Sequence, residues 1–292
     1  MKASAFAYAR ATSVDHALQL LSVHGEAAKV LSGGQSLMPA MNLRLISPGV
    51  IVDIGELSEL RGVAVREDVL RIGALTRHAE LLRSSEIIAN APLLAGAAAH
   101  VAHPAIRNRG TIGGSLAHAD PAAELPACML ALEATIVVRG GHGERRIPAT
   151  DFFTGIFETT LAIDELLVAV ELPIARKTSA HFFHEFARRH GDYAIAGLAA
   201  QAIVEGGFFA ELRLAYFALG DRPALAAAAA RLINVAVTPA LISEASATLA
   251  EELEPHEDQQ ASSAMRGHLA NVLFKRAIAA LLRRPELAGA AA

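Results

Sequence analysis

Two short glycine loops contain the residues whose types and spacing point most directly to chemistry. They are Ser32-Gly33-Gly34-Gln35-Ser36 and Thr111-Ile112-Gly113-Gly114-Ser115. Glycine permits positive φ and lets a ligand approach the backbone without a Cβ in the way. Successive N–H groups in such a turn form a concave anion site, to which the flanking hydroxyl groups add hydrogen bonds. Two such loops suit a ligand with two linked phosphates, as in a dinucleotide.

Other interpretations of the same residues stay open at this point. No G-x-G-x-x-G follows a strand, and no G-x-x-x-x-G-K-[ST] is present, so neither common nucleotide-binding motif applies. A metal site is a weaker alternative, because Pro104 breaks the helix that would align its first two ligands. Its candidate ligands are His100, His103, His118 and Asp120. Neither Ser36 nor Ser115 lies in the G-x-S-x-G elbow of a hydrolase nucleophile.

The composition limits the classes of protein to which the chain can belong. It has 292 residues, of which 53% are hydrophobic, with 26 basic and 30 acidic side chains. This composition excludes disorder as the main state, and the scattered basic residues form no nucleic-acid footprint. The single cysteine, Cys128, cannot close an internal disulfide or hold an iron–sulfur cluster within this chain, and we expect a buried, inert thiol. We expect a soluble, cytoplasmic protein, because the uncharged stretch 87–106 is rich in alanine and contains two prolines and two histidines.

The elements that would position the two loops follow from hydrophobic periodicity. A buried strand at 29–31 leads into the first loop, and a helix at 37–45 follows it. The second loop lies in an expected irregular segment, 103–121, which precedes a helix through Ala131. Further helices are expected at 13–24, 76–83, 86–101, 224–232, 238–253 and 258–282. Further strands are expected at 50–54, 63–66, 69–73, 135–139, 166–172, 182–187, 194–204 and 212–219. This order predicts an α+β protein with a domain boundary near 173–179.

Two long segments resemble one known family. Residues 29–54, KVLSGGQSLMPAMNLRLISPGVIVDI, are similar to the first flavin loop of the FAD-binding medium subunit of molybdenum hydroxylases, the xanthine dehydrogenase and carbon monoxide dehydrogenase family. Residues 103–127, HPAIRNRGTIGGSLAHADPAAELPA, are similar to its second flavin loop, and GDYAIAG at 191–197 resembles the opening of its C-terminal domain. The segments occur in the family's order, so the resemblance covers essentially the whole chain.

The resemblance implies a fold and a division into domains. It implies a two-part α/β FAD-binding domain of the PCMH or vanillyl-alcohol-oxidase type at 1–176, with sub-parts at about 1–56 and 57–176. A small domain with a three-stranded sheet and a helical bundle would follow at 177–285, before a tail at 286–292.

The resemblance also implies the residues that bind FAD. The first loop would wrap the pyrophosphate and part of the flavin edge, the second would cover the pyrophosphate from the other side, and Tyr193 would lie over the isoalloxazine face. The implied cofactor-binding residues are Val30, Leu31, Ser32, Gly33, Gly34, Gln35, Ser36, Leu37, Thr111, Ile112, Gly113, Gly114, Ser115, Asp120, Glu124, Leu167 and Tyr193. The chain departs from the commonest family pattern at Ser32, often alanine, and at Ser115, often Asn or Asp. Both changes predict altered hydrogen bonding with binding retained.

The resemblance implies an electron-transfer subunit with no catalytic residue and no metal ligand of its own. Substrate would react at a molybdopterin centre on a large partner subunit, and electrons would pass through two [2Fe-2S] clusters on a small subunit to FAD in this chain and then to an external acceptor. A dimer of heterotrimers is the expected assembly. His103, Arg107 and Arg109 receive no chemical role, and the two arginines are expected to hold the loop or meet a partner.

Two alternatives remain from the sequence, together with one test. If the electron-transfer assignment is wrong, the chain is one of two other things. It is either a self-contained FAD oxidoreductase of the vanillyl-alcohol-oxidase type or a non-enzymatic nucleotide-binding module. Valine in place of Gly33 or Gly113 is expected to block FAD binding by intruding on the phosphates.

Overall fold

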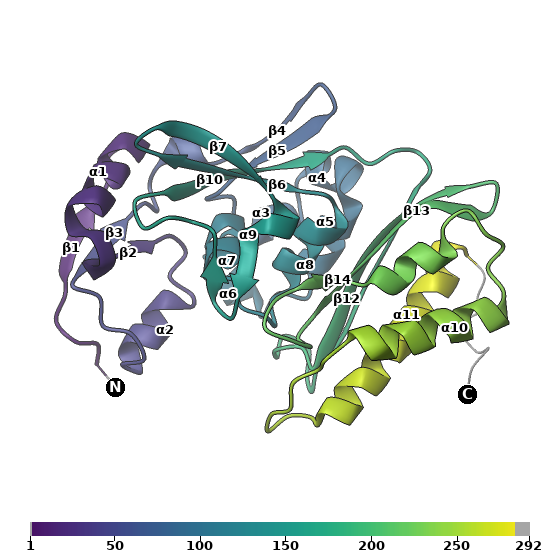
Figure 1. Cartoon of the computed structure of the whole chain (residues 1–292). Helices are drawn as coiled ribbons and strands as arrows, with labels where there is room; N and C mark the ends of the chain where they lie inside the picture. Colours follow the sequence, from purple (N-terminus) through teal and green to yellow (C-terminus); the bar gives the residue numbers. More distant parts are fainter. Residues whose placement is uncertain (1, 284–292) are drawn as a thin grey trace.

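Four sheets organise residues 2–283, the part of the chain that this computed structural model describes (Figure 1). The expected tail at 286–292 lies outside the described residues. The strands are β1 (Ala7–Arg10), β2 (Ala28–Leu31), β3 (Val50–Asp53), β4 (Val63–Arg66), β5 (Val69–Gly73), β6 (Thr135–Gly140), β7 (Gly143–Pro148), β8 (Phe153–Gly155), β9 (Glu158–Thr159), β10 (Leu166–Pro173), β11 (Ser179–Phe186), β12 (Ala196–Glu205), β13 (Phe208–Phe217) and β14 (Ala224–Leu225). The α-helices are α1 (Val14–His24), α2 (Leu37–Asn42), α3 (His78–Leu81), α4 (Ser85–Asn90), α5 (Pro92–Ala98), α6 (Pro104–Arg107), α7 (Ile112–His118), α8 (Glu124–Ala131), α9 (Ala149–Phe152), α10 (Pro239–Glu252) and α11 (Ser263–Leu281). The short 3-10 helices are η1 (Gly25–Ala27), η2 (Ser58–Leu60) and η3 (Ala227–Leu232).

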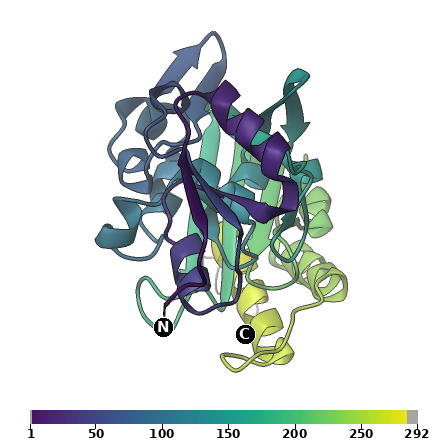
Figure 2. The same cartoon turned by 90° about the vertical axis from the view of Figure 1, so that its left-hand side faces the viewer.

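The N-terminal sheet is small and parallel, in the order β1-β3-β2, and faces the viewer in Figure 2. Its helix α1 begins where the sequence predicts, because the Ser13 hydroxyl accepts the N–H of His16 and caps the helix. The predicted apolar side of α1 is buried and packs on β2 and β3. This sheet therefore holds the carboxyl end of β2, from which the first glycine loop emerges.

The middle sheet has five antiparallel strands in the order β4-β5-β10-β6-β7. The predicted hairpin of β4 and β5 forms at the expected residues. Side chains of the five-stranded sheet share one core with the helices between β5 and β6. Cys128 is fully buried in that core, as predicted. Burial also raises the pKa of the Cys128 thiol, which leaves it unreactive.

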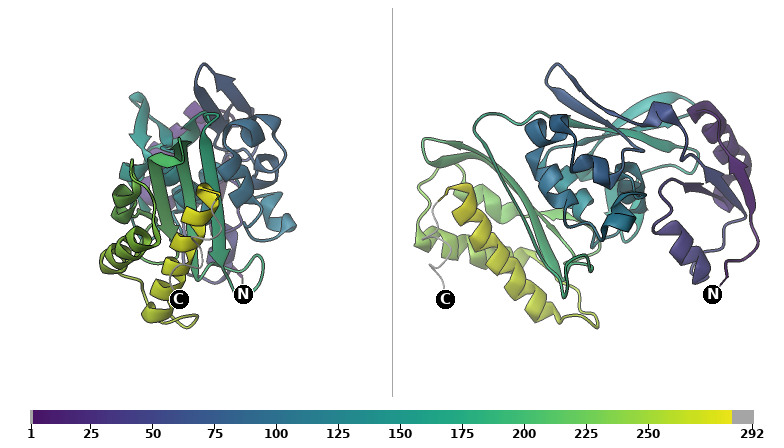
Figure 3. Two further views of the ribbon diagram at one scale, coloured as in Figure 1. Left: turned by 90° about the vertical axis from the view of Figure 1, so that its right-hand side faces the viewer. Right: turned by 180° about the vertical axis from the view of Figure 1, so that it is seen from behind.

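The C-terminal sheet runs β11-β12-β13-β14 between two layers of helices (Figure 3). Helix α11 packs on β11 and β12 from one side, with α10 beside it, while α5 and α8 contact the sheet from the other side. The predicted helix at 224–232 is wrong: residues 224–225 pair with β13 as a fourth strand, and residues 227–232 form the 3-10 helix η3. The expected three-stranded sheet therefore has a short fourth strand.

Three further expectations differ from the structure. The segment predicted as irregular contains α6, which starts with a proline at its first position, and α7, which includes both glycines. Helix α3 begins after Arg77 and not at Thr76, and α11 begins at Ser263, five residues later than expected. Within residues 2–283, no helix combines the length and the apolarity that a membrane crossing requires.

Candidate functional site

The first glycine loop joins the end of β2 to the start of α2. Its backbone N–H groups from Gly33 to Ser36 donate to no acceptor among residues 2–283. Gly34 has φ +71, and the Gln35 amide donates to the Gly33 carbonyl oxygen at 3.0 Å, which closes the turn. Consecutive free N–H groups beyond a parallel strand are the arrangement that binds phosphate oxygens.

The two glycine loops touch each other. The Ser32 and Thr111 hydroxyl oxygens lie 2.7 Å apart. A Cβ at Gly33 would overlap the Arg109 carbonyl oxygen and lie 2.8 Å from the Cα of Gly110. The prediction that both loops belong to one site is therefore consistent with their contact, although they lie far apart in the sequence.

The backbone N–H groups of the second loop are already hydrogen-bonded within the chain, whereas its sequence suggests that they are free. The Ile112 and Gly113 N–H groups donate to the carbonyl oxygens of Thr76 and Ala74, and that of Gly114 donates to the Thr111 hydroxyl at 3.1 Å. These donors are already used within the chain, so the expectation of free N–H groups is wrong for this loop. What remains for a ligand is the partly exposed surface of Gly114 and Ser115.

The glycines of both loops are required for packing, which changes the proposed valine test. A Cβ at Gly113 would lie 2.6 Å from the Cβ of Ala74, on the side of the loop that packs on the chain. Valine at Gly33 or Gly113 would therefore disrupt the loops themselves before it reached a phosphate. The expected loss of binding stands, but its cause is loop packing.

Residues that sequence reasoning missed hold the second loop in place. The Arg77 guanidinium donates to the Arg109 carbonyl oxygen, and the His78 N–H donates to the Gly110 carbonyl oxygen at 3.0 Å. The His78 ring is buried against Gly110, and burial lowers the pKa of its imidazole to about 4, so the ring is neutral. Arg107 donates to the carbonyl oxygens of Val101 and Ala102, both at 2.8 Å, and so binds the segment that leads into α6; this contact fits the first of the two roles considered for it. No local pattern marks Arg77 or His78, because both act through contacts remote in sequence.

The predicted acidic residues follow α7. Asp120 accepts the N–H of Ala122 at 2.9 Å, and Glu124 is the first residue of α8. Burial, together with the charge of Glu185, raises the pKa of the Glu124 carboxyl to about 7. Glu124 therefore holds its proton to a higher pH than an exposed glutamate does.

Tyr193 lies on the loop between β11 and β12 and is 63% exposed. Gly191 of the same loop has φ +87 and lies so close to His103 and Ala102 that a Cβ would contact both. The pKa of the Tyr193 phenol is raised by partial burial and then by the charges of Asp120 and Glu124.

Leu167 differs from the other predicted residues because its side chain is only 3% exposed and belongs to the core. It lies at a β-bulge of β10, where the pairing with β6 shifts between Leu167 and Ala169. Any contact of Leu167 with a ligand would have to come from its backbone.

The structure does not support the weaker alternative of a metal site among the described residues. No group of three or more His, Cys, Asp or Glu side chains within residues 2–283 is arranged to hold a metal ion. His103 instead packs against Gly191, and the Nδ1 of His100 lies 3.6 Å from a Glu185 carboxylate oxygen.

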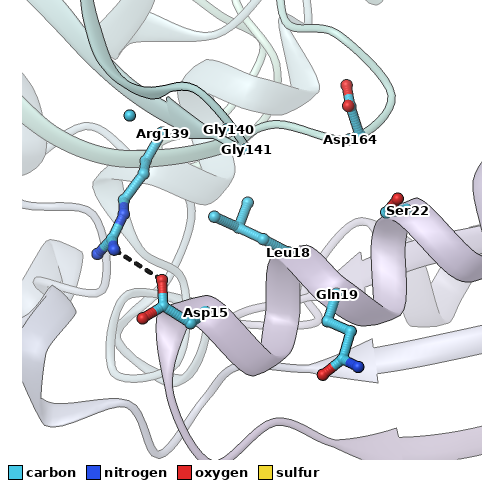
Figure 4. Close-up of a pocket in the computed structure, with 9 residues that line it drawn as sticks. Asp15, Leu18, Gln19, Ser22, Arg139, Gly140, Gly141 and Asp164 are labelled. Atoms are coloured by element: carbon cyan, nitrogen blue, oxygen red, sulfur yellow. Dashed lines mark hydrogen bonds and ion pairs between the residues drawn. The ribbon is translucent and has the colours of Figure 1, made fainter.

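A separate cavity of about 410 Å³ lies between α1 and the hairpin of β6 and β7 (Figure 4). Asp15 and Arg139 face each other across it and form an ion pair at 2.6 Å, while Leu18 adds an apolar wall. Asp15 and Arg139 satisfy each other, and the cavity includes none of the glycine-loop residues. We therefore do not assign the site to this cavity.

Comparison with known proteins identifies the family. Residues 4–175 match the family described as the FAD binding domain in molybdopterin dehydrogenase. The chain belongs to this family. Residues 181–281 match the CO dehydrogenase flavoprotein C-terminal domain. The chain thus carries an FAD-binding domain, and its family resemblance to medium subunits of molybdenum hydroxylases is confirmed.

Named relatives cover nearly the whole chain. The chain is 40% identical to the 6-hydroxypseudooxynicotine dehydrogenase complex subunit alpha of Paenarthrobacter nicotinovorans, over 97% of each protein. A solved carbon monoxide dehydrogenase from Hydrogenophaga pseudoflava matches with a TM-score of 0.95 and 36% identity, covering 97% of this chain and 99% of that one. Quinoline 2-oxidoreductase from Pseudomonas putida matches with a TM-score of 0.91 and 36% identity, covering 97% and 99%. The relatives are subunits of oxidoreductases, and this chain is therefore an oxidoreductase component.

Proposed function

We propose that this chain is the FAD-binding electron-transfer subunit of a molybdenum-containing dehydrogenase. The observation that carries the proposal is the first glycine loop, whose consecutive N–H groups from Gly33 to Ser36 lack acceptors within the described residues. These donors fit the linked phosphates of FAD, the cofactor of the family to which the chain belongs. FAD, when bound, supplies the redox chemistry, accepting electrons and passing them on.

Different residues around this loop would contact different parts of the cofactor. The first loop would bind the phosphates through its backbone, and Ser115 and the surface of Gly114 would cover them from the second loop. Tyr193, which is exposed, would cover the flavin ring. The proposed cofactor-binding residues are residues 30–37, residues 111–115, Asp120, Glu124, Leu167 through its backbone, and Tyr193.

Electron transfer into this subunit would need partners. Cys128 is the sole cysteine of the sequence and is buried, so cysteine-ligated clusters must lie elsewhere. We propose a small subunit with two [2Fe-2S] clusters as donor, a large molybdopterin subunit as the site of substrate oxidation, and an external acceptor. The assembly would be a dimer of heterotrimers in the cytoplasm. Within the chain we propose an FAD-binding domain at 1–176, with sub-parts near 1–56 and 57–176, and a C-terminal domain from 177.

Purification of the full chain with and without its partners tests the proposal. The expected result is a yellow protein with a flavin spectrum that co-purifies with a molybdenum-containing large chain. The isolated chain is expected to show no substrate turnover. A colourless protein that binds no flavin, or an isolated chain that oxidises a small substrate at a normal rate, would overturn the proposal.

A further inference from the structure

The loop between β11 and β12 rests on the FAD-binding domain. We call residues 187–195 the Tyr193 loop; it leaves β11 at Phe186 and enters β12 at Ala196. The base of the loop is closed by the Ile195 N–H, which donates to the Phe186 carbonyl oxygen at 2.6 Å. The tip of the loop packs instead on the segment 100–103, which follows α5 in the other domain.

Two contacts join the tip of the Tyr193 loop to this segment. Gly191 has φ +87, and a Cβ on it would lie 2.6 Å from Cε1 of His103 and 2.9 Å from the Ala102 carbonyl oxygen. The rings of His190 and His100 stack with their centroids 6.0 Å apart. Glycine permits both this φ and this close approach, so the position of the tip depends on a tight backbone fit to the segment.

Glu185, the residue before the end of β11, faces the FAD-binding domain. Side chains alternate along a strand, and Phe183 packs on the core that contains α5 and α8, whereas Phe182 and Phe186 pack on the core that contains α11. The Glu185 side chain is 5% exposed, and its Oε1 lies 3.6 Å from Nδ1 of His100. The other oxygen, Oε2, is buried without a hydrogen-bond partner among the described residues.

The buried Glu185 carboxylate is stabilised by a positive charge on His100. Removing a carboxylate from water is costly unless an ion partner or hydrogen bonds compensate for the lost hydration. The His100 side chain is 33% exposed, so its proton exchanges with solvent. Interaction with Glu185 is the largest cause that raises the pKa of His100, so the charged imidazole persists to a higher pH than in an exposed histidine. The pair therefore joins the two domains while His100 is charged and loses its attraction as the pH rises.

Other charged or titratable groups act on His100 from the neighbouring elements. They are His184 on β11, His190 in the Tyr193 loop, Glu124 on α8, and Arg107 on α6, which donates to the Ala99 carbonyl oxygen at 3.4 Å. Burial is the largest cause that lowers the pKa of His184, so this histidine stays neutral near pH 7. Burial raises the pKa of Glu124 to about 7, and its negative charge extends the charged state of His100 to higher pH. Arg107 stays charged over this range. Loss of the His100 proton is therefore the event that breaks the pair.

We propose that the His100–Glu185 pair is a latch that holds the Tyr193 loop on the FAD-binding domain and so positions Tyr193 over the flavin. The role towards the flavin rests on the proposed function, because it requires FAD at that place. Both members are positioning residues: Glu185 fixes the strand end from which the loop leaves, and His100 fixes the segment on which its tip rests. The loop stays closed while His100 carries its proton and opens more often as the pH rises from 6 to 9.

Proteolysis of the full chain without FAD tests the latch. The Tyr193 loop carries Arg188 and Arg189, both exposed, and a protease that cuts after arginine needs the loop to leave the segment 100–103. Cleavage at these two residues, identified by mass spectrometry and measured relative to a short arginine peptide, is expected to accelerate in the wild type from pH 6 to 9. His100→Gln and Glu185→Gln are each expected to be cut about tenfold faster at pH 6 and to lose the pH dependence.

A double variant and a control separate one shared contact from two independent effects. His100→Gln combined with Glu185→Gln is expected to be cut no faster than the faster single variant, because both residues act through one contact. His142→Gln is the matched control, since His142 is exposed in the turn between β6 and β7 of the middle sheet, and it is expected to keep the wild-type profile. Single effects that multiply, or coinciding profiles for the wild type and His100→Gln, would overturn the latch and leave the proposed function intact. If His100→Gln fails to fold, Glu185→Gln and the wild-type profile decide.

The release of bound FAD tests the role of the latch towards the flavin. A flavin that the Tyr193 loop covers leaves when the loop opens, so the FAD dissociation rate at pH 6 is expected to rise in His100→Gln by about the same factor as the cleavage rate. In a Tyr193→Ala background, His100→Gln is expected to leave the dissociation rate unchanged. Equal rates for the wild type and His100→Gln would overturn the positioning of Tyr193 over the flavin. A chain that binds no FAD would overturn the proposed function, while the proteolysis still decides whether the latch exists.

Discussion

Replacing Gly33 with alanine tests whether the two glycine loops must touch to form one site. The added Cβ would overlap the Arg109 carbonyl oxygen and lie 2.8 Å from the Cα of Gly110. Ordinary contact begins at 3.4 Å, so the Gly110 backbone would have to retreat by at least 0.6 Å (3.4 − 2.8). The φ of Gly33 is not positive, so the effect of the substitution comes from this contact and not from backbone strain.

The second loop resists this movement because it is hydrogen-bonded to residues 77 and 78. Its Arg109 carbonyl oxygen accepts from the Arg77 side chain, and its Gly110 carbonyl oxygen accepts from the His78 N–H. Overpacking of this kind costs about 1–3 kcal/mol. Since about 1.4 kcal/mol corresponds to a tenfold change in Kd, we expect Gly33→Ala to weaken FAD binding about tenfold or more.

Quenching of flavin fluorescence measures the Kd, and urea unfolding measures the stability of the same variant. Gly96→Ala is the matched control, because Gly96 is exposed in α5 and a Cβ there meets nothing within 4 Å. The control is expected to keep the Kd and to gain about 0.5–1 kcal/mol of stability from the higher helix propensity of alanine. Wild-type Kd and wild-type stability in Gly33→Ala would refute the claim that the loops form a single packed site.

Three further substitutions test the charges and caps around the site. Because the pKa of Glu124 rises from 4.5 to about 7 on folding, the folded chain keeps a proton that the unfolded chain has released, and stability falls as pH rises across this window. Glu124→Gln should remove this fall, which is up to about 3 kcal/mol, in urea unfolding at pH 4.5 and 8; an unchanged pH dependence would contradict the buried-acid assignment. Thr111→Val removes the hydroxyl that caps α7 and should cost about 1 kcal/mol and weaken FAD binding, whereas unchanged unfolding and Kd would show that the cap is dispensable. Arg266→Met removes the donor to the buried Ala218 carbonyl oxygen and to the part-buried Ile195 carbonyl oxygen, and should cost about 2–4 kcal/mol by urea unfolding; a loss under about 0.5 kcal/mol would show that these hydrogen bonds contribute little.

Much of the fold is predictable from local sequence, and the exceptions have physical causes. The Ser13 cap of α1 and the hairpin of β4 and β5 follow from patterns within a few residues, and both are confirmed. The helix expected at 224–232 fails, because Ala224 and Leu225 pair with β13 and this pairing outweighs the helix propensity of alanine. The glycines of α7 lie inside a helix because Gly113 packs on Ala74, which no local pattern reveals.

Some features of the candidate site are likewise predictable from local sequence, and others depend on long-range contacts. The first loop is recognisable as a phosphate site, because its strand, glycines and helix follow one another in the sequence. The contact of Gly33 with residues 109–110 joins segments 76 residues apart, and the pairing of His100 with Glu185 joins opposite sides of the domain contact. Such long-range contacts depend on how the sheets and helices pack, so the loop junction and the His100–Glu185 pair become visible only in the folded structure.

The central claim is that the first glycine loop binds the linked phosphates of FAD, and a comparison of FAD with FMN tests it most directly. FMN lacks the second phosphate and the adenosine, so it forgoes hydrogen bonds to charged oxygens worth about 1.5–3 kcal/mol each. Titration of the full chain, followed by flavin fluorescence, is expected to show one FAD per chain bound at least about a hundredfold more tightly than FMN. Equal affinities for the two flavins, or no binding of FAD, would contradict the claim.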